Sequence, residues 1–224
     1  EQVFAVILTS WLAFGPSRAR YDRVGEVRQS SEKELILCNL AARREALLEL
    51  GGFNEALYPN EENALMDELQ KRGGKLVYDP DFLVQRRPRA DLRSFARMLM
   101  TYGRGRAEQF RLHPTLGSAL NFVPPLFLVY LVVLGPLTAF GALGKLLLLP
   151  LGLYVLTLLA QGAMLARRGH PLFALGALPL VVLTHVLYGW GFWRGLFTPL
   201  KAAGERAPVE VVLERVPLKR GGSL

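Results

Sequence analysis

The chain has 224 residues, a formal net charge of +8, one cysteine and 51% hydrophobic residues. This composition excludes a purely soluble globular protein and a disordered chain, and the unpaired Cys38 excludes a secreted domain built on disulfides. Sixteen of the 19 acidic residues lie at or before Glu108, and the other three lie from Glu205 onwards. We therefore expect a mixed-charge part at 1–113, an apolar part at 114–200 and a polar tail at 201–224. Nothing at the start resembles a signal peptide, so we expect Glu1 to lie inside a longer protein.

The mixed-charge part is predicted to contain short strands and longer helices. Glycine pairs end two of the helices, because glycine takes the left-handed cap conformation without strain. Asn60 is a predicted N-cap, and Glu61 and Glu62 would occupy a first turn where the helix dipole favours carboxylates. Strands are predicted at Glu34–Cys38, Lys75–Tyr78 and Phe82–Gln85, and helices at Arg43–Leu50, Asn60–Arg72 and Asp91–Arg111. So few strands with long helices, and no glycine-rich phosphate loop, indicate part of a larger α/β domain.

The apolar part is predicted to cross a membrane about three times. A helix needs about 20 apolar residues to span the hydrocarbon core, and internal Pro and Gly are tolerated there. A buried soluble helical bundle is the alternative, but it would need polar faces that these segments lack. The predicted spans are Asn121–Phe140, Leu146–Leu165 and Leu172–Trp193.

Basic residues predict the orientation of these spans. Arginines gather before the first span and again at Arg167-Arg168, so both sites should be cytoplasmic, with Lys145 alone in the outer turn. Three spans would place the tail outside, although the tail is itself basic. A third segment that re-enters the membrane or lies at its surface would remove the conflict, and the sequence leaves both possibilities open. The arginines before the first span are Arg86, Arg87, Arg89, Arg93, Arg97, Arg104, Arg106 and Arg111.

The order of residues from Cys38 to His113 resembles the second half of the catalytic domain of family 2 glycosyltransferases. Its Gly-Gly-Phe-Asp-Glu stretch corresponds to Gly51–Glu55 here, and its Glu-Asp pair corresponds to Glu61-Glu62. The segments 102–106 and 188–192, together with the apolar spans, are similar to the succinoglycan-type exopolysaccharide branch. The resemblance implies the C-terminal part of an α/β fold called GT-A, followed by an all-α membrane region.

The departures from this family pattern concern the donor site. The family's N-terminal half binds the nucleotide and holds Mg²⁺ or Mn²⁺ through an Asp-x-Asp motif, so the ligands of that cation are expected outside this chain. Asp79-Pro80-Asp81 matches the motif only as text, because it follows the glutamate pair. A processive Gln-x-x-Arg-Trp motif falls on Met98, Thr101 and Tyr102, which favours transfer of a single sugar.

The resemblance also suggests roles for particular residues. Glu62 is the candidate catalytic base in place of the family's aspartate, with Glu61 beside it to orient it or to bind the acceptor. Both glutamates could instead simply stabilise a helix start. Tyr102, Arg104 and Arg106 are candidates for contacts with a diphosphate or polyprenyl phosphate, and the alternative is a basic cluster that attracts anionic lipid.

Two residues outside these motifs also allow more than one interpretation. His185, inside the third span, is a functional candidate, or a neutral histidine bonded to a neighbouring helix. Cys38 is interpreted as a small buried apolar residue.

These expectations describe a multi-pass protein of the bacterial inner membrane with its catalytic domain in the cytoplasm. Its activity would be inverting transfer of a hexose from a nucleotide-sugar to a polyprenyl-phosphate-linked or polysaccharide acceptor in cell-surface polysaccharide synthesis. Without a donor half, the chain alone is expected to be inactive. The alternative is a catalytically inactive membrane adaptor that binds anionic lipid or a partner protein. Nucleic-acid binding is not expected, because residues 1–113 carry a net charge of only +2.

Overall fold

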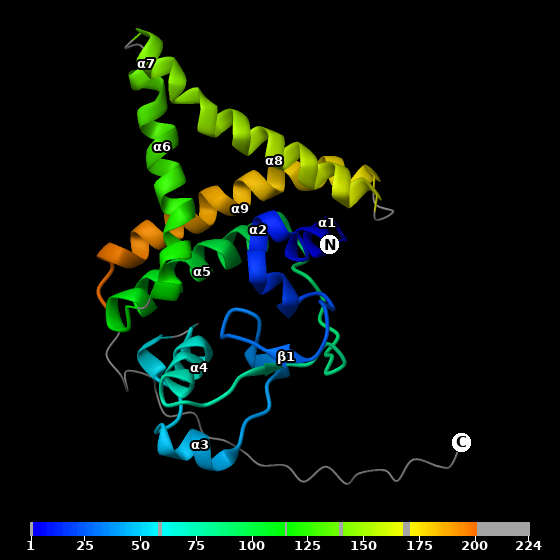
Figure 1. Cartoon of the computed structure of the whole chain (residues 1–224), viewed down its shortest axis with the longest axis vertical. Coiled ribbons are helices and arrows are strands. Elements are labelled where there is room, and N and C mark those ends of the chain that lie inside the picture. Colours follow the sequence, from blue (N-terminus) through cyan, green and yellow to red (C-terminus); the bar gives the residue numbers. More distant parts are fainter. Residues whose placement is uncertain (1, 58–59, 115, 139–140, 168–170, 201–224) are drawn as a thin grey trace.

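The computed structural model of the chain describes residues 2–57, 60–114, 116–138, 141–167 and 171–200. Within these residues the protein is mostly helical, and Figure 1 shows long helices above a smaller part with short elements. Short 3-10 segments lie at Gly15–Arg20, Leu37–Asn39, Glu55–Leu57 and Leu116–Phe122. The helices are α1 (Gln2–Leu8), α2 (Trp11–Phe14), α3 (Arg44–Glu49), α4 (Glu61–Lys71), α5 (Leu92–Leu112), α6 (Val123–Thr138), α7 (Gly141–Leu146), α8 (Leu148–Arg167) and α9 (Pro171–Phe197).

The expected α/β sheet is reduced to one antiparallel pair in the described part of the chain. Strand β1 (Arg28–Gln29) pairs with β2 (Val77–Tyr78), with Arg28 opposite Tyr78. The predicted strand at Glu34–Cys38 is wrong: Glu34 accepts hydrogen bonds from Arg28 and Ser30, and the chain turns there instead of extending.

The predicted strand at Phe82–Gln85 is also wrong. This segment is held to the neighbouring segment of the same chain by the Asn39 side chain, which donates to the carbonyl of Phe82. A ladder of backbone hydrogen bonds with other described residues does not form there. With two strands described, the GT-A sheet is not seen.

The helices of the mixed-charge part agree with their predicted ranges to within a residue or two. Helix α3 ends before Gly51, whose φ of 75° is the left-handed conformation that glycine allows. Helix α5 begins after Asp91, whose Oδ1 accepts a hydrogen bond from the backbone N–H of Ser94 at 2.7 Å. That bond lowers the pKa of the exposed Asp91 carboxyl, because it favours the charged form.

The main core lies where α1, α5 and α9 meet. Phe4 of α1 stacks on Phe95 of α5 with ring centroids 4.8 Å apart, and Phe95 is fully buried. Leu99 of α5 and Ala177 of α9 belong to the same buried cluster. Helix α1, which precedes the polar part in sequence, is therefore packed against the long helices.

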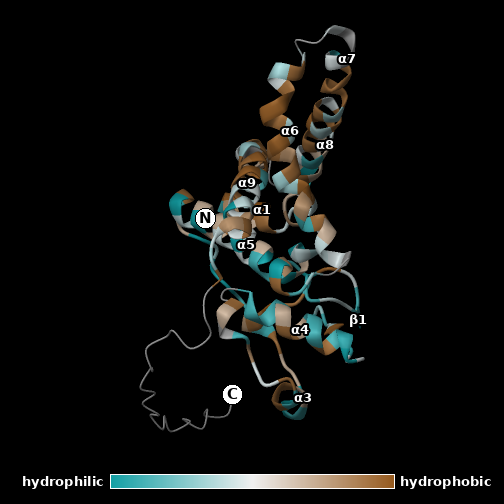
Figure 2. Cartoon of the chain, turned by 90° about the vertical axis from the view of Figure 1, so that its left-hand side faces the viewer, coloured by the Kyte–Doolittle hydropathy of each residue, from teal (hydrophilic) through white to brown (hydrophobic). Residues whose placement is uncertain are grey.

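Three helical stretches are long and apolar enough to cross a membrane, which indicates a membrane protein. They cover Gly117–Thr138, Gly144–Arg167 and Phe173–Phe197 and so overlap the three predicted spans. Figure 2 shows hydrophobic colouring along much of α6 and α8, with hydrophilic residues around α4 and β1. The predicted span end at Phe140, Arg168 and the tail after Leu200 lie outside the described residues.

Candidate functional site

The first turn of α4 is fastened to α5 by a buried amide. The side chain of Asn60 donates to the carbonyl oxygen of Gly105 at 3.1 Å and to Oε1 of Gln109 at 2.6 Å. Helix α4 begins at Glu61 as predicted, but Asn60 makes no side-chain cap bond to it. Because both acceptors of the Asn60 amide belong to α5, the two predicted carboxylates lie beside that helix.

Glu62 is a buried carboxylate with 8% of its surface exposed. Its Oε1 accepts a hydrogen bond from the amide of Asn63 at 3.2 Å. Burial raises the pKa of Glu62 and the charge of Glu61 adds to this, while Arg20 and Arg106 act in the opposite direction. A carboxylate with a raised pKa is a stronger base than one in water, which suits proton abstraction.

Glu61 lies partly exposed beside it. Its Oε2 atom is enclosed and accepts no hydrogen bond from the described residues. An enclosed acceptor atom of this kind is available to a donor group on a bound molecule.

Asn63 holds two guanidinium groups next to Glu62. Its Oδ1 accepts hydrogen bonds from Arg20 at 2.5 Å and from Arg106 at 3.2 Å, while its amide also donates to Oδ1 of Asn60 at 2.7 Å. Asn63 is 1% exposed, so these bonds are shielded from water. The result is a buried polar network that joins α4, α5 and the segment before β1.

Arg20, like Asn63, belongs to this network without any sequence pattern that would select it. Burial, followed by the nearby charge of Arg106, lowers the pKa of Arg20 to about 10. That value is still far above neutral, so Arg20 remains charged at pH 7. It belongs to no motif, and its partner Asn63 lies 43 residues away in sequence.

The two arginines predicted to bind phosphate point to different neighbours. Arg106 turns toward α4 and Glu32, whereas Arg104 lies 3.3 Å from Glu108 on its own helix. Positions two apart on a helix lie on nearly opposite faces, which explains the separation. Gly103 lies against the backbone of α9, where an added Cβ would overlap the carbonyl of Tyr188. This glycine therefore serves helix packing.

Tyr102 lies beside Tyr21, with their hydroxyl oxygens 3.4 Å apart. Burial raises the pKa of Tyr21, and the neighbouring Tyr102 raises it further, while the charges of Arg20 and Arg86 lower it. Tyr21 thus interacts both with Tyr102, which was predicted as a site residue, and with a group of arginines that includes Arg20 and Arg86.

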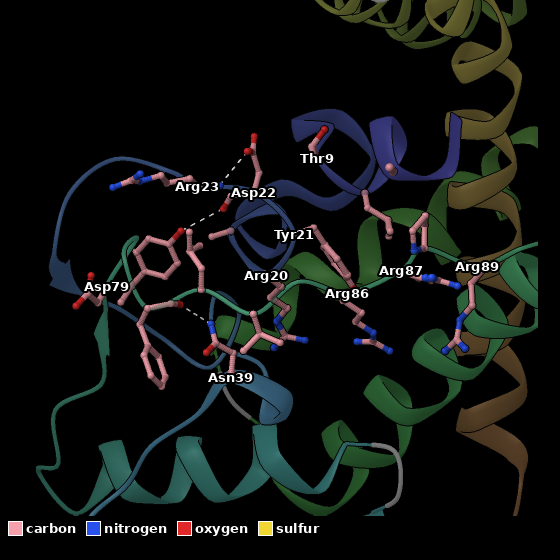
Figure 3. Close-up of a pocket in the computed structure, with 18 of the residues that line it drawn as sticks. Thr9, Arg20, Tyr21, Asp22, Arg23, Asn39, Asp79, Arg86, Arg87 and Arg89 are labelled. Atoms are coloured by element: carbon pink, nitrogen blue, oxygen red, sulfur yellow. Dashed lines mark hydrogen bonds between the residues drawn. The ribbon is translucent and has the colours of Figure 1, made fainter. Parts of the chain in front are cut away.

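That group lines a cavity of about 340 Å³ between α1, the turn before β1 and the segment 82–89. Figure 3 shows Arg20 and Arg86 near its centre, Arg87 and Arg89 at one end, and Asp22, Arg23 and Asp79 at the other. Arg23 is paired with Asp81. Among the residues that the structure describes, no carboxylate forms an ion pair with Arg86, Arg87 or Arg89. One end of the cavity therefore carries uncompensated positive charge, which favours an anionic ligand.

The donor set for a divalent cation is not assembled in the described part of the chain. No group of three or more His, Cys, Asp or Glu residues comes together there. Asp79 accepts a hydrogen bond from the backbone of Asp81, and Asp81 binds Arg23, so this pair forms a salt-bridged turn. These residues do not fit a metal centre.

The structure also locates His185 and Cys38. Nδ1 of His185 lies 2.9 Å from the hydroxyl of Tyr154, and Nε2 lies 3.0 Å from the carbonyl oxygen of Leu12. A carbonyl only accepts, so Nε2 carries a proton and donates a hydrogen bond to Leu12, and the ring bonds both neighbours. Cys38 is exposed, which corrects the expectation that it is buried. The 3-10 turn that replaces the predicted strand brings it to the surface.

The chain is similar to the succinoglycan biosynthesis protein ExoA of Rhizobium meliloti (strain 1021), with 27% identity over 201 residues. The match covers 88% of this chain and 56% of the relative, so the chain spans little more than half the relative's length. No family model matches the chain, and no solved structure matches it.

Proposed function

We propose that the chain is part of a membrane-bound inverting glycosyltransferase of family 2. It would transfer a sugar from a nucleotide-sugar to a polyprenyl-phosphate-linked or polysaccharide acceptor in cell-surface polysaccharide synthesis. The motif order from Cys38 to His113 and the similarity to a succinoglycan biosynthesis protein support this class of reaction. The apolar helices support attachment to a membrane, and we place the catalytic part on the cytoplasmic side of the bacterial inner membrane.

A buried carboxylate joined by hydrogen bonds to an arginine that lines a cavity is the observation that carries the proposal. Glu62 is joined through Asn63 to Arg20, and Arg20 also lines the cavity. One network therefore links a group able to accept a proton to a site able to hold negative charge.

In the proposed reaction, Glu62 accepts the proton of the acceptor hydroxyl as that oxygen bonds to the anomeric carbon. The bond from the anomeric carbon to the diphosphate oxygen breaks at the same time, and the diphosphate leaves with the electron pair. Arg20, Arg86 and Arg87 would balance its charge, because a guanidinium presents paired donors to phosphate oxygens. Glu61, with one enclosed oxygen, is assigned to the acceptor.

The test uses the complete enzyme that contains this chain, in membranes, with labelled nucleotide-sugar and the extracted lipid acceptor. Glu62→Gln is expected to lower kcat by about 100-fold or more and to leave donor binding unchanged, because it removes only the proton acceptor. Glu68→Gln is the matched control, since Glu68 lies on the same helix with 42% of its side chain exposed. Retained turnover in Glu62→Gln, measured alongside an active wild type, would contradict the assignment.

The arginine cavity gives the same assay a second comparison. Arg86→Gln/Arg87→Gln should raise the KM for a phosphate-bearing substrate about tenfold or more, because each lost charged hydrogen bond weakens binding. Arg43→Gln/Arg44→Gln, at the exposed start of α3, should leave both constants unchanged.

A membrane adaptor without activity is the second candidate, favoured by the exposed arginines that have no carboxylate partner among the described residues. Such a cluster attracts anionic lipid. Absence of transfer by the wild type, together with vesicle binding that requires phosphatidylglycerol and is lost in Arg86→Gln/Arg87→Gln, would favour this reading.

A further inference from the structure

Helix α9 differs from the other two candidate spans in its surroundings. In its most apolar stretch 28% of the residues are buried inside the protein, compared with 11% in each of the spans that contain α6 and α8. Length and composition qualify all three to cross a membrane, so neighbouring elements must decide which of them do.

The C-terminal part of helix α9 is packed against α5 through glycines. A Cβ on Gly103 of α5 would overlap the backbone of α9, and a Cβ on Gly191 or Gly195 of α9 would overlap the backbone of α5. At the far end, Arg111 of α5 donates to the carbonyls of Gly195 and Thr198. The two helices run in the same direction, and these contacts join residues 100–111 of α5 to residues 188–198 at the end of α9.

The opposite face of α5 is bonded to the polar part. The carbonyl of Gly105 accepts from Asn60, and Arg106 donates to Asn63, so amides, a carboxylate and two guanidinium groups lie directly beneath α5. Helix α5 is thus enclosed between α9 and this network. Figure 1 shows α5 and α9 running across the long direction of α6.

An α9 perpendicular to the membrane would therefore carry α5 and its polar partners into the hydrocarbon, where charged groups are costly. We propose that α9 lies along the membrane surface with α5 between it and the polar part, and that, of the helices the structure describes, only α6 and α8 cross the bilayer. This inference rests on packing and does not depend on the proposed enzymatic activity.

The exposed apolar surface of α9 and α2 is suited to contact with a lipid bilayer. Leu175, Trp190 and Phe197 of α9 are between 57% and 79% exposed, and Trp11 of α2 is 61% exposed. Helix α8 also exposes several leucines, and tryptophan is typical of the membrane–water boundary.

Polar side chains inside the helical layer complete the arrangement. The backbone N–H of Leu12 donates to Gln161 of α8 at 3.3 Å, and its carbonyl accepts from His185 of α9 at 3.0 Å. Backbone groups at a break between short helices need partners when water is excluded. Gln161 and His185 therefore hold the α1–α2 segment in the same surface layer as α9.

The two topologies differ in the position of the chain just after α9. With two crossings, Pro199 lies on the same side as Cys38, and Lys145 in α7 lies on the opposite side. With three crossings, Pro199 lies on the side of Lys145. The three positions are exposed.

The test is labelling with a membrane-impermeant maleimide in spheroplasts and in everted membrane vesicles. Native Cys38, the single cysteine, reports the polar part, and Lys145→Cys and Pro199→Cys are each made in a Cys38→Ser background. We expect Lys145→Cys to react only in spheroplasts, and Cys38 and Pro199→Cys to react only in everted vesicles. Labelling of Pro199→Cys from the same side as Lys145→Cys would overturn the proposal.

A second measurement gives an answer if Pro199→Cys reacts from neither side. The full chain is fused at its C-terminus to a fluorescent protein that matures only in the cytoplasm, and separately to alkaline phosphatase, which is active only outside. Two crossings predict fluorescence without phosphatase activity when Cys38 is cytoplasmic, and the reverse pattern excludes them.

Discussion

The two faces of α5 are held by opposite means. Toward α4 the helix is joined by hydrogen bonds through Asn60, Asn63 and Arg106, whereas toward α9 it is joined by close approach of backbones at glycines. Hydrogen bonds need defined donors and acceptors, and each lost partner leaves a buried polar group unsatisfied. Glycine contacts need only empty space, so they fail when any side chain is added.

Gly103→Leu should have the largest effect, because its side chain would occupy the position of the Tyr188 carbonyl and force α9 away. We expect a loss of about 3 kcal/mol in stability. Thermal unfolding in detergent, followed by tryptophan fluorescence, measures it. Gly152→Leu in α8 is the control, since an added Cβ there meets no atom within 4 Å. Equal melting temperatures for the two variants would show that backbone contact does not hold this face.

Asn63→Leu should have a smaller effect of about 2 kcal/mol, because it removes the acceptor shared by Arg20 and Arg106. The same unfolding measurement applies. Asn54→Leu, at an exposed turn, loses only a bond to the backbone of Ala56 and should cost less than about 1 kcal/mol. A cost for Asn63→Leu no greater than that of Asn54→Leu would mean that the network contributes little.

Glu62→Gln should have the smallest effect on stability, and of the opposite sign at neutral pH. The raised pKa means that the folded protein binds the Glu62 proton more tightly than the unfolded chain does. This stabilisation is complete below about pH 4.3, the unfolded value, and is lost as the pH rises through the folded pKa. Glu62→Gln should therefore unfold at a higher temperature than wild type at pH 7, with the difference shrinking toward pH 4. A lower melting temperature for Glu62→Gln than for the wild type at pH 7 would contradict the raised pKa of Glu62.

The parts of the fold predictable from sequence are those set by local pattern. The spans follow from uninterrupted apolar length, and the ends of α3, α4 and α5 follow from glycines and Asp91. The strands at Glu34–Cys38 and Phe82–Gln85 failed, because a strand also needs a neighbour to pair with and the described residues provide none.

The site was predictable only in part, for a similar reason. Glu61, Glu62 and Tyr102 stood out by motif, and the roles proposed for them remain predictions. Arg20 and Asn63 contribute through contacts between distant segments, which no local pattern records. From the sequence, the arginines at 86, 87 and 89 served only to predict the orientation of the spans. Their position in the lining of a cavity became visible only in the structure.

The direct backbone contact between α5 and α9 also has a mechanical consequence. Side chains at an interface can change rotamer and absorb movement, but two backbones in contact have no such slack. A tilt of α9, for example when the bilayer thins, must therefore turn α5 with it. Since Arg106 lies on α5 and contacts Asn63, such a tilt would be transmitted as a displacement beside Glu62. On the proposed placement of α9, a change in the bilayer would therefore reach the buried carboxylate through α5.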